Sequence, residues 1–183
     1  MALVAALSAG CTRRGHPAGL VVPSTLGELR LDGALTEQDW RRAARTGPFL
    51  EGPGRLAASP YSEARLLWDE QRLYLGLYAA EEALDDAFTI RIRTATRTST
   101  FQLSARSSTT SPSGVIVGVS RDDHPREWMV ECGLSWSALG VAPRPGLAAS
   151  LELLRCGSRE RRCSGWGGLG FDPAGGRIEL DAR

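Results

Sequence analysis

The chain has 183 residues, of which 42% are hydrophobic, and a formal net charge of +1. This length and composition predict one globular domain with its own hydrophobic core. A net charge near zero gives no long-range attraction to nucleic acid or to an anionic membrane surface, so we expect no nucleic-acid partner. All 22 basic residues are arginine. Codon bias in a GC-rich genome accounts for this at least as well as a preference for carboxylate or sulfate ligands does.

The amino terminus predicts an export signal. Residues 1–10 are apolar or small, and Cys11 follows them directly. This pattern resembles a bacterial lipoprotein signal with Cys11 as the acylated residue. A truncated ordinary signal peptide or a chance apolar start are the alternatives. We expect a signal peptide over 1–10, a polar tether over 11–27 and a folded domain over 28–183. The protein would then lie in the bacterial cell envelope, as an outer-membrane lipoprotein or a periplasmic or cell-surface protein, held to the membrane by its lipid anchor only.

A turn followed by a short helix opens the predicted domain. Asp32-Gly33 supplies a position for positive φ, and Thr36 with Asp39 forms a potential capping box. We therefore expect a helix over about 36–44, with Trp40 on its apolar side.

The remainder of the domain reads as a succession of strands. A hairpin turn is predicted at Asp69-Glu70-Gln71, since apolar residues precede it and Leu73, Leu75 and Leu77 alternate after it. Strands at such short, regular spacing, separated by Gly, Pro, Ser and Asp clusters, predict an all-β antiparallel sandwich with one short N-terminal helix. The predicted strands cover 63–69, 72–80, 87–94, 99–106, 114–121, 126–135, 147–156, 162–168 and 176–180.

The cysteines divide into separate roles. Cys156 and Cys163 bracket a polar loop between two apolar strands, so they are placed to form a hairpin disulfide in an oxidising compartment. Cys132 alternates with Val130 and Leu134, which predicts a buried thiol. No C-x-x-C pair is present, so we expect no metal site at the cysteines.

Alternation also predicts a polar sheet face. Phe88, Ile90 and Ile92 point inward if Thr89, Arg91 and Arg93 point outward. On the next strand, the outward side chains are Thr100, Gln102, Ser104 and Arg106. If the two strands pair, a polar and basic face results, which is either a ligand-binding face or simply the solvated side of a sheet.

Several segments together resemble carbohydrate-binding module family 9 and its DOMON-like relatives. The leading two are the "LDGALTEQDW" start at Leu31–Trp40 and the hairpin around "WDEQRLY" at Trp68–Tyr74. The resemblance continues through Glu127–Glu131, Leu134–Trp136, Leu151–Arg155, Gly165–Trp166 and Gly176–Leu180. It implies a jelly-roll-type β-sandwich that binds a poly- or oligosaccharide and is not an enzyme.

The resemblance also suggests site residues. Arg155 matches an arginine common in the family, and Trp166 lies near its Trp-containing segment, whereas Thr89 and Gln102 stand where sugar-binding members have Glu and Arg. The two positions of the family's tryptophan clamp fall near Ala83 and within 167–175, where this chain has no Trp. The candidate ligand-binding residues are Thr89, Arg91, Arg93, Gln102, Ser104, Arg106, Arg155 and Trp166. No cofactor is expected, although calcium is possible near Glu81.

Two other functions stay open. A structural or protein-interaction lipoprotein would have kept the sandwich and lost the sugar site. A DOMON-like redox module would hold haem, but Met129 and His124 are the only candidate axial ligands outside the tether and stand five residues apart. Catalysis has little support, because His124 lies in a predicted turn and His16 in the tether.

Overall fold

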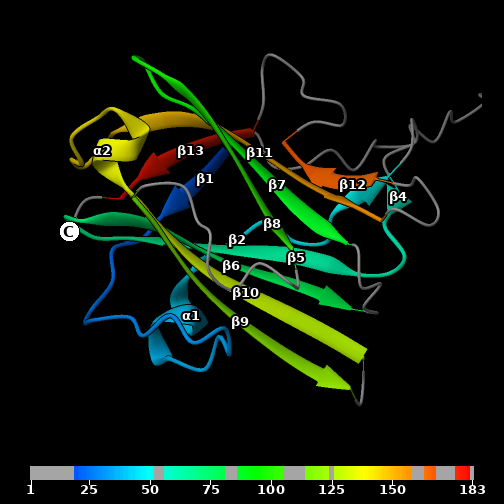
Figure 1. Cartoon of the computed structure of the whole chain (residues 1–183). Helices are drawn as coiled ribbons and strands as arrows, with labels where there is room; N and C mark the ends of the chain where they lie inside the picture. Colours follow the sequence, from blue (N-terminus) through cyan, green and yellow to red (C-terminus); the bar gives the residue numbers. More distant parts are fainter. Residues whose placement is uncertain are drawn as a thin grey trace, which may run out of the picture.

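The computed structural model describes residues 19–51, 56–80, 86–104, 114–123, 126–157, 163–167 and 176–181. Two sheets face each other and form the predicted β-sandwich (Figure 1). The helices are α1 (Gln38–Arg42) and α2 (Trp136–Leu139). The strands are β1 (Gly19–Val22), β2 (Ala44–Arg45), β3 (Leu50–Glu51), β4 (Leu56–Ala57), β5 (Ser62–Trp68), β6 (Arg72–Ala80), β7 (Ala87–Arg93), β8 (Thr98–Ser104), β9 (Val115–Asp123), β10 (Arg126–Ser135), β11 (Ala148–Cys156), β12 (Cys163–Trp166) and β13 (Gly176–Leu180).

We call the two layers sheet A and sheet B. Sheet B has five strands in the order β2-β5-β6-β10-β9, and sheet A has eight strands. In sheet A, β11 pairs with β7 along one edge and with β13 and then β12 along the other, while β8 extends the sheet beyond β7. Neighbouring strands are antiparallel except for β1, which runs parallel to β13. Strand β11 therefore joins both halves of sheet A.

The core lies between the sheets because each strand turns one set of alternate side chains inward. Strand β7 follows this rule, with Phe88, Ile90 and Ile92 buried and the residues between them partly exposed. Trp128 from sheet B packs against Phe88, with ring centroids 5.1 Å apart. The free thiol of Cys132 is also buried there, and burial raises its pKa to about 12.

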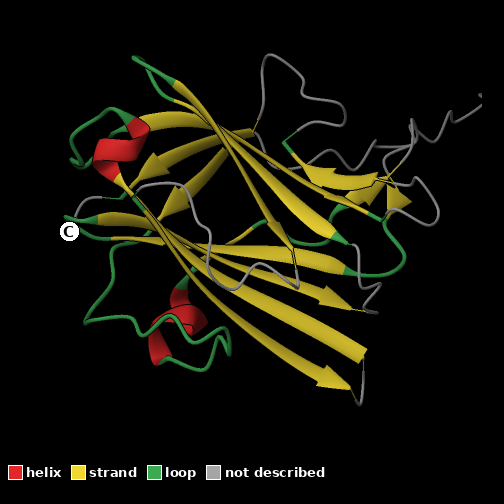
Figure 2. Cartoon of the chain, in the orientation of Figure 1, coloured by secondary structure: helices red, strands yellow, loops and turns green. Residues whose placement is uncertain are grey.

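A second apolar cluster lies on the other side of sheet B, under the segment 26–43. Its members are Leu29, Trp40, Ala43, Leu67 and Tyr74. Figure 2 shows α1 and its adjoining loops against the outer face of the lower sheet. Gly33 has φ +92°, as the predicted turn requires. The apolar side chains around Trp40 thus pack the N-terminal segment against sheet B.

The helix start differs from the expected capping box. The N-cap residue is Glu37, and no side chain caps the helix. Asp39 instead accepts hydrogen bonds from the backbone N–H groups of Leu26 and Gly27, at 2.9 and 3.4 Å. The carboxylate thus accepts from two backbone donors of the preceding segment rather than from the first turn of its own helix.

The predicted strands agree with the structure to within a few residues, and those at 72–80, 126–135 and 176–180 have the predicted bounds. The expected tether is too long at its carboxyl end, because β1 lies within it and pairs with β13. Val22 of β1 is fully buried, so this short apolar run contributes to the core. No helix in the described part of the chain is long and apolar enough to cross a membrane.

Candidate functional site

The outer face of sheet A carries the polar residues that alternation predicted. Arg91 on β7 lies opposite Thr100 on β8 and opposite Glu152 on β11. One step along, Thr89 lies opposite Gln102 on one side and Leu154 on the other. Since paired residues project to the same face, these side chains form two adjacent rows on the outside of the sandwich.

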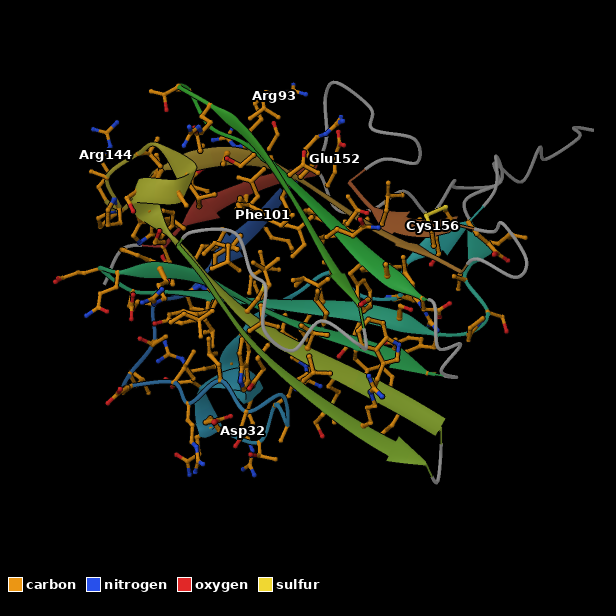
Figure 3. All side chains as sticks on the ribbon, viewed as in Figure 1. Asp32, Arg93, Phe101, Arg144, Glu152 and Cys156 are labelled. Atoms are coloured by element: carbon orange, nitrogen blue, oxygen red, sulfur yellow. A yellow bond between two sulfur atoms is a disulfide. The ribbon has the colours of Figure 1, made fainter. Side chains whose placement is uncertain are left out.

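Two further predicted residues extend these rows. Arg93 lies opposite Thr98 and Ser150, at one end of β7, and Ser104 lies opposite Ala87, at the other end. In Figure 3, Arg93 and Glu152 project from the upper side of the upper sheet, and Phe101 lies on its core-facing side. The structure therefore brings Thr89, Arg91, Arg93, Gln102 and Ser104 together on one surface.

Glu152 is an acidic group that lies beside Arg91, and no motif in the sequence marks it as a site residue. The residue is 2% exposed, and its Oε2 lies 3.7 Å from Nη1 of Arg91, whose side chain is 30% exposed. A buried carboxylate holds a neighbouring guanidinium in place because ionic attraction strengthens as water is excluded. Glu152 lies opposite Arg91 because β11 and β7 pair in the register that also places Leu153 opposite Ile90. This register cannot be deduced from the sequence.

Arg155 does not lie on this face, contrary to expectation. Its guanidinium is buried on the inner side of sheet A, where Nε and Nη2 donate to Oδ2 of Asp86 at 3.0 and 2.6 Å. Nη1 donates to Oγ of Ser62 at 2.8 Å, and Nη2 donates to the carbonyl of Ala80 at 2.9 Å. Since Ser62 and Ala80 belong to sheet B, this arginine links the two sheets.

Trp166 also lies away from the expected surface. Its indole is fully buried in the inter-sheet core, opposite Leu153 on β11. Gly176 lies beneath the ring, and a methyl group there would come within 2.4 Å of it. The large apolar ring is therefore a core element, since exposing it would cost the free energy gained by burying its area.

The predicted disulfide is present. Cys156 and Cys163 are cross-strand partners on β11 and β12, and their sulfurs are bonded. Cys156 also lies opposite Ala87 on β7, at one end of the polar rows. Chain-entropy arguments give such a short loop roughly 2–3 kcal/mol of stabilisation.

Other sequence predictions lie outside the described residues. These include Arg106, Cys11, His124, Glu81 and the positions of the family's aromatic clamp. In the described part of the chain, no group of three or more His, Cys, Asp and Glu side chains is placed to hold a metal ion.

Comparisons with known proteins identify the fold. No protein-family model matches the sequence, and no curated protein does. Among solved structures, a family 9 carbohydrate-binding module from Caldicellulosiruptor kristjanssonii, in complex with cellotriose, is similar with a TM-score of 0.71. The two are 15% identical, and the match covers 90% of this chain and 94% of that module.

A second solved structure agrees. It is a protein from Bacteroides uniformis, described as a candidate carbohydrate-binding protein, with a TM-score of 0.65 and 11% identity. The match covers 89% of this chain and 99% of that one. The resemblance in the sequence is thus confirmed at the level of the fold: this chain has the β-sandwich of a family 9 carbohydrate-binding module.

Proposed function

We propose that the chain is a non-catalytic carbohydrate-binding module that binds an oligosaccharide on the outer face of sheet A. The observation that carries the proposal is the match along nearly the whole chain to a family 9 module that holds cellotriose. Because the match covers 90% of this chain, the sandwich accounts for nearly all of the sequence.

The chemistry of the face supports saccharide binding. A sugar hydroxyl both donates and accepts hydrogen bonds, so its site needs both kinds of group. Arg91 and Arg93 supply donors in a planar fork, Gln102 supplies a donor and an acceptor, and the hydroxyls of Thr89 and Ser104 serve as either. The packing of Arg91 against Glu152 limits the conformational entropy that the arginine loses on binding.

The cellular setting is part of the proposal. Acylation of Cys11 would place the module on the cell envelope, where the disulfide between Cys156 and Cys163 is chemically stable. Mass spectrometry of the protein expressed in bacteria tests this point, with Cys11→Ser as the control. A mature protein that starts at a residue other than 11, or that carries no lipid, would contradict the anchor.

The binding test is a glycan array and a polysaccharide pull-down with the Cys11→Ser chain, with and without calcium. Cellotriose, neutral glucans and acidic polysaccharides are the probes. We expect binding that Arg91→Ala with Gln102→Ala lowers strongly without changing the unfolding transition. Arg144→Ala, in an exposed loop, is the matched control. Full binding by the double variant would show that the ligand lies elsewhere.

A protein-interaction lipoprotein is the second candidate, and one observation favours it. None of the described side chains that project from the rows of β7, β8 and β11 is aromatic, whereas sugar sites commonly use an aromatic ring as a stacking surface. A folded chain that retains no glycan on the array would favour this function.

A further inference from the structure

The exposed aromatic surface of the described chain lies on sheet B, not on sheet A. The described part of the chain has five large hydrophobic side chains that are exposed. These are Val21, Leu26, Leu56, Tyr61 and Ile116, among which Tyr61 is the only aromatic one. Tyr61 directly precedes β5 and is 41% exposed. A tyrosine ring that is partly exposed has an apolar face available for contact with a ligand or partner.

Tyr61 lies on the part of sheet B that the N-terminal segment does not cover. That segment contacts Leu67 and Tyr74, near one end of β5 and β6. At the other end of the two strands, Glu63 pairs with Tyr78, and both project to the outer face. Figure 2 shows the strands of the lower sheet running on past α1 and its loops.

Two tyrosine rings meet on this uncovered part. The ring centroids of Tyr61 and Tyr78 are 6.0 Å apart, and their planes are inclined by 57°. We name the group formed by these rings, Glu63 and Glu127 the tyrosine patch. Together the rings present apolar area at low entropic cost, because a tyrosine side chain has few rotatable bonds.

Hydrogen bonds hold both rings. The hydroxyl of Tyr61 donates to Oε2 of Glu63 at 2.8 Å, and that of Tyr78 donates to Oε2 of Glu127 at 2.6 Å. Glu63 is in turn held by Arg65, whose Nε lies 3.2 Å from Oε1. Since bonds to ionised carboxylates are among the stronger hydrogen bonds, the patch is organised before any ligand arrives.

The charges of the patch favour an uncharged ligand. Nη1 of Arg45 lies 3.7 Å from Oε1 of Glu63, in addition to the bond from Arg65. Among the side chains that the structure describes here, the charged groups are Glu63, Glu127, Arg45 and Arg65, and Asp122 on β9 lies opposite Glu127 in the strand register. Both guanidinium groups lie against Glu63, and both carboxylates accept from tyrosine hydroxyls, so these side chains offer donors and acceptors that suit the hydroxyls of an uncharged ligand.

We infer that the tyrosine patch is a second saccharide-binding surface, which takes a soluble, neutral glycan chain. The apolar C–H face of a sugar ring packs on a tyrosine ring, while its hydroxyls reach the fixed carboxylate and guanidinium groups. Because the two rings are inclined by 57°, a flat crystalline polysaccharide surface cannot lie on both. A single chain can turn successive sugars toward each ring. The ligand class rests on the proposed function, but the site is on the opposite sheet.

The test measures binding of cellohexaose by calorimetry, and of crystalline cellulose by pull-down, with the Cys11→Ser chain. Tyr61→Ala with Tyr78→Ala removes both rings, and we expect it to weaken cellohexaose binding by about tenfold. Tyr61→Phe with Tyr78→Phe keeps both rings and should retain most of the affinity, which also separates lost stacking from lost folding. Ile116→Ala, an exposed apolar residue elsewhere on sheet B, is the matched control.

The outcomes separate this inference from the proposed function. Weaker cellohexaose binding only in Tyr61→Ala with Tyr78→Ala would support the tyrosine patch and would show that this ligand does not bind on sheet A. Loss only in Arg91→Ala with Gln102→Ala overturns the patch and supports the face on sheet A, while partial loss in both supports two surfaces. Equal binding of crystalline and soluble glucan would overturn the single-chain specificity. If the Cys11→Ser chain without further substitutions bound no neutral glucan, the inference about the tyrosine patch would be wrong. Its binding to acidic polysaccharides would then test the proposed site on sheet A separately.

Discussion

The indole Nε1 of Trp40 donates a 2.7 Å hydrogen bond to Oε1 of Glu131, a residue 91 positions later in the chain. The same carboxylate accepts the backbone N–H of Gly33 at 2.7 Å and that of Leu35 at 3.3 Å. Burial raises the pKa of Glu131, although the bonds from Gly33 and Trp40 oppose this. The conspicuous "DGALTEQDW" segment is thus held to sheet B by one buried acceptor.

Replacing that acceptor should loosen the segment. In Glu131→Gln the side-chain amide has a single oxygen for three N–H donors, and its own N–H2 group faces donors rather than acceptors. We expect the free energy of unfolding to fall by about 1–3 kcal/mol, as measured by urea titration. Glu179→Gln, at a partly exposed carboxylate on β13, should change little. An unchanged midpoint for Glu131→Gln would mean that the carboxylate does not hold the segment.

Gly118 allows the segment to approach the sheet. A methyl group at this position would lie 2.3 Å from the carbonyl oxygen of Leu31 and 2.8 Å from the backbone nitrogen of Gly33. Since backbone atoms cannot move aside cheaply, Gly118→Ala should destabilise the fold by about 1–3 kcal/mol. Gly27→Ala is the control, because a methyl group there meets no atom within 4 Å. The comparison needs only thermal unfolding of both variants, and equal melting temperatures would contradict the close approach.

The buried ion pair between Arg155 and Asp86 should matter far more than an exposed one. Their side chains are 4% and 6% exposed, with Nη2 and Oδ2 2.6 Å apart. Arg155→Met leaves the Asp86 carboxylate buried without its cation, which should cost about 3–5 kcal/mol.

The chain supplies a matched control for this prediction. Arg177 and Glu179 lie 2.7 Å apart but are 64% and 43% exposed. Arg177→Met should therefore change the free energy of unfolding by only about 0–1 kcal/mol. Similar losses for both variants, in urea titrations at neutral pH, would show that burial does not govern the strength of the Arg155 pair.

The tyrosine patch predicts a pH dependence at high pH. Burial and the bond to Glu63 raise the pKa of Tyr61 to about 12, and the bond to Glu127 with burial raises that of Tyr78 to about 12. The ordinary value is 10.0. Above it, the unfolded chain loses these protons while the folded chain keeps them, so the stability that the patch contributes should decline between about pH 10 and 12.

The ultraviolet absorbance of tyrosinate, followed as the pH is raised from about 10 to 12, measures the loss of the tyrosine protons directly. Tyr61→Phe and Tyr78→Phe should each remove one late-titrating group from the folded protein. Tyr74, held by Asp69 at 2.8 Å, also titrates late because burial raises its pKa. Early titration of both patch tyrosines, near the ordinary value, would contradict the hydrogen bonds to Glu63 and Glu127.

Local pattern was sufficient to predict much of this fold. Alternation of apolar and polar residues predicted β7, with Phe88, Ile90 and Ile92 inside. The turn at Asp69 was also legible, because its Oδ1 accepts the backbone N–H groups of Gln71 and Arg72, at 2.7 and 2.8 Å. Both features depend on neighbours within a few residues, which is the range over which sequence periodicity carries information.

The tertiary structure decided what the sequence by itself left open. In the run Leu151–Arg155 three of five residues are leucine, so alternation does not mark one face, and a cation is ordinarily expected to face solvent. Arg155 turns inward because Asp86 and Ser62, which lie 69 and 93 residues away, satisfy its guanidinium. In the same way, Asp39 binds the backbone of residues 26 and 27 rather than its own helix. A buried charge is stable only beside its partners, and Arg155 gains its partners only when β7 pairs with β11 and the two sheets close over each other.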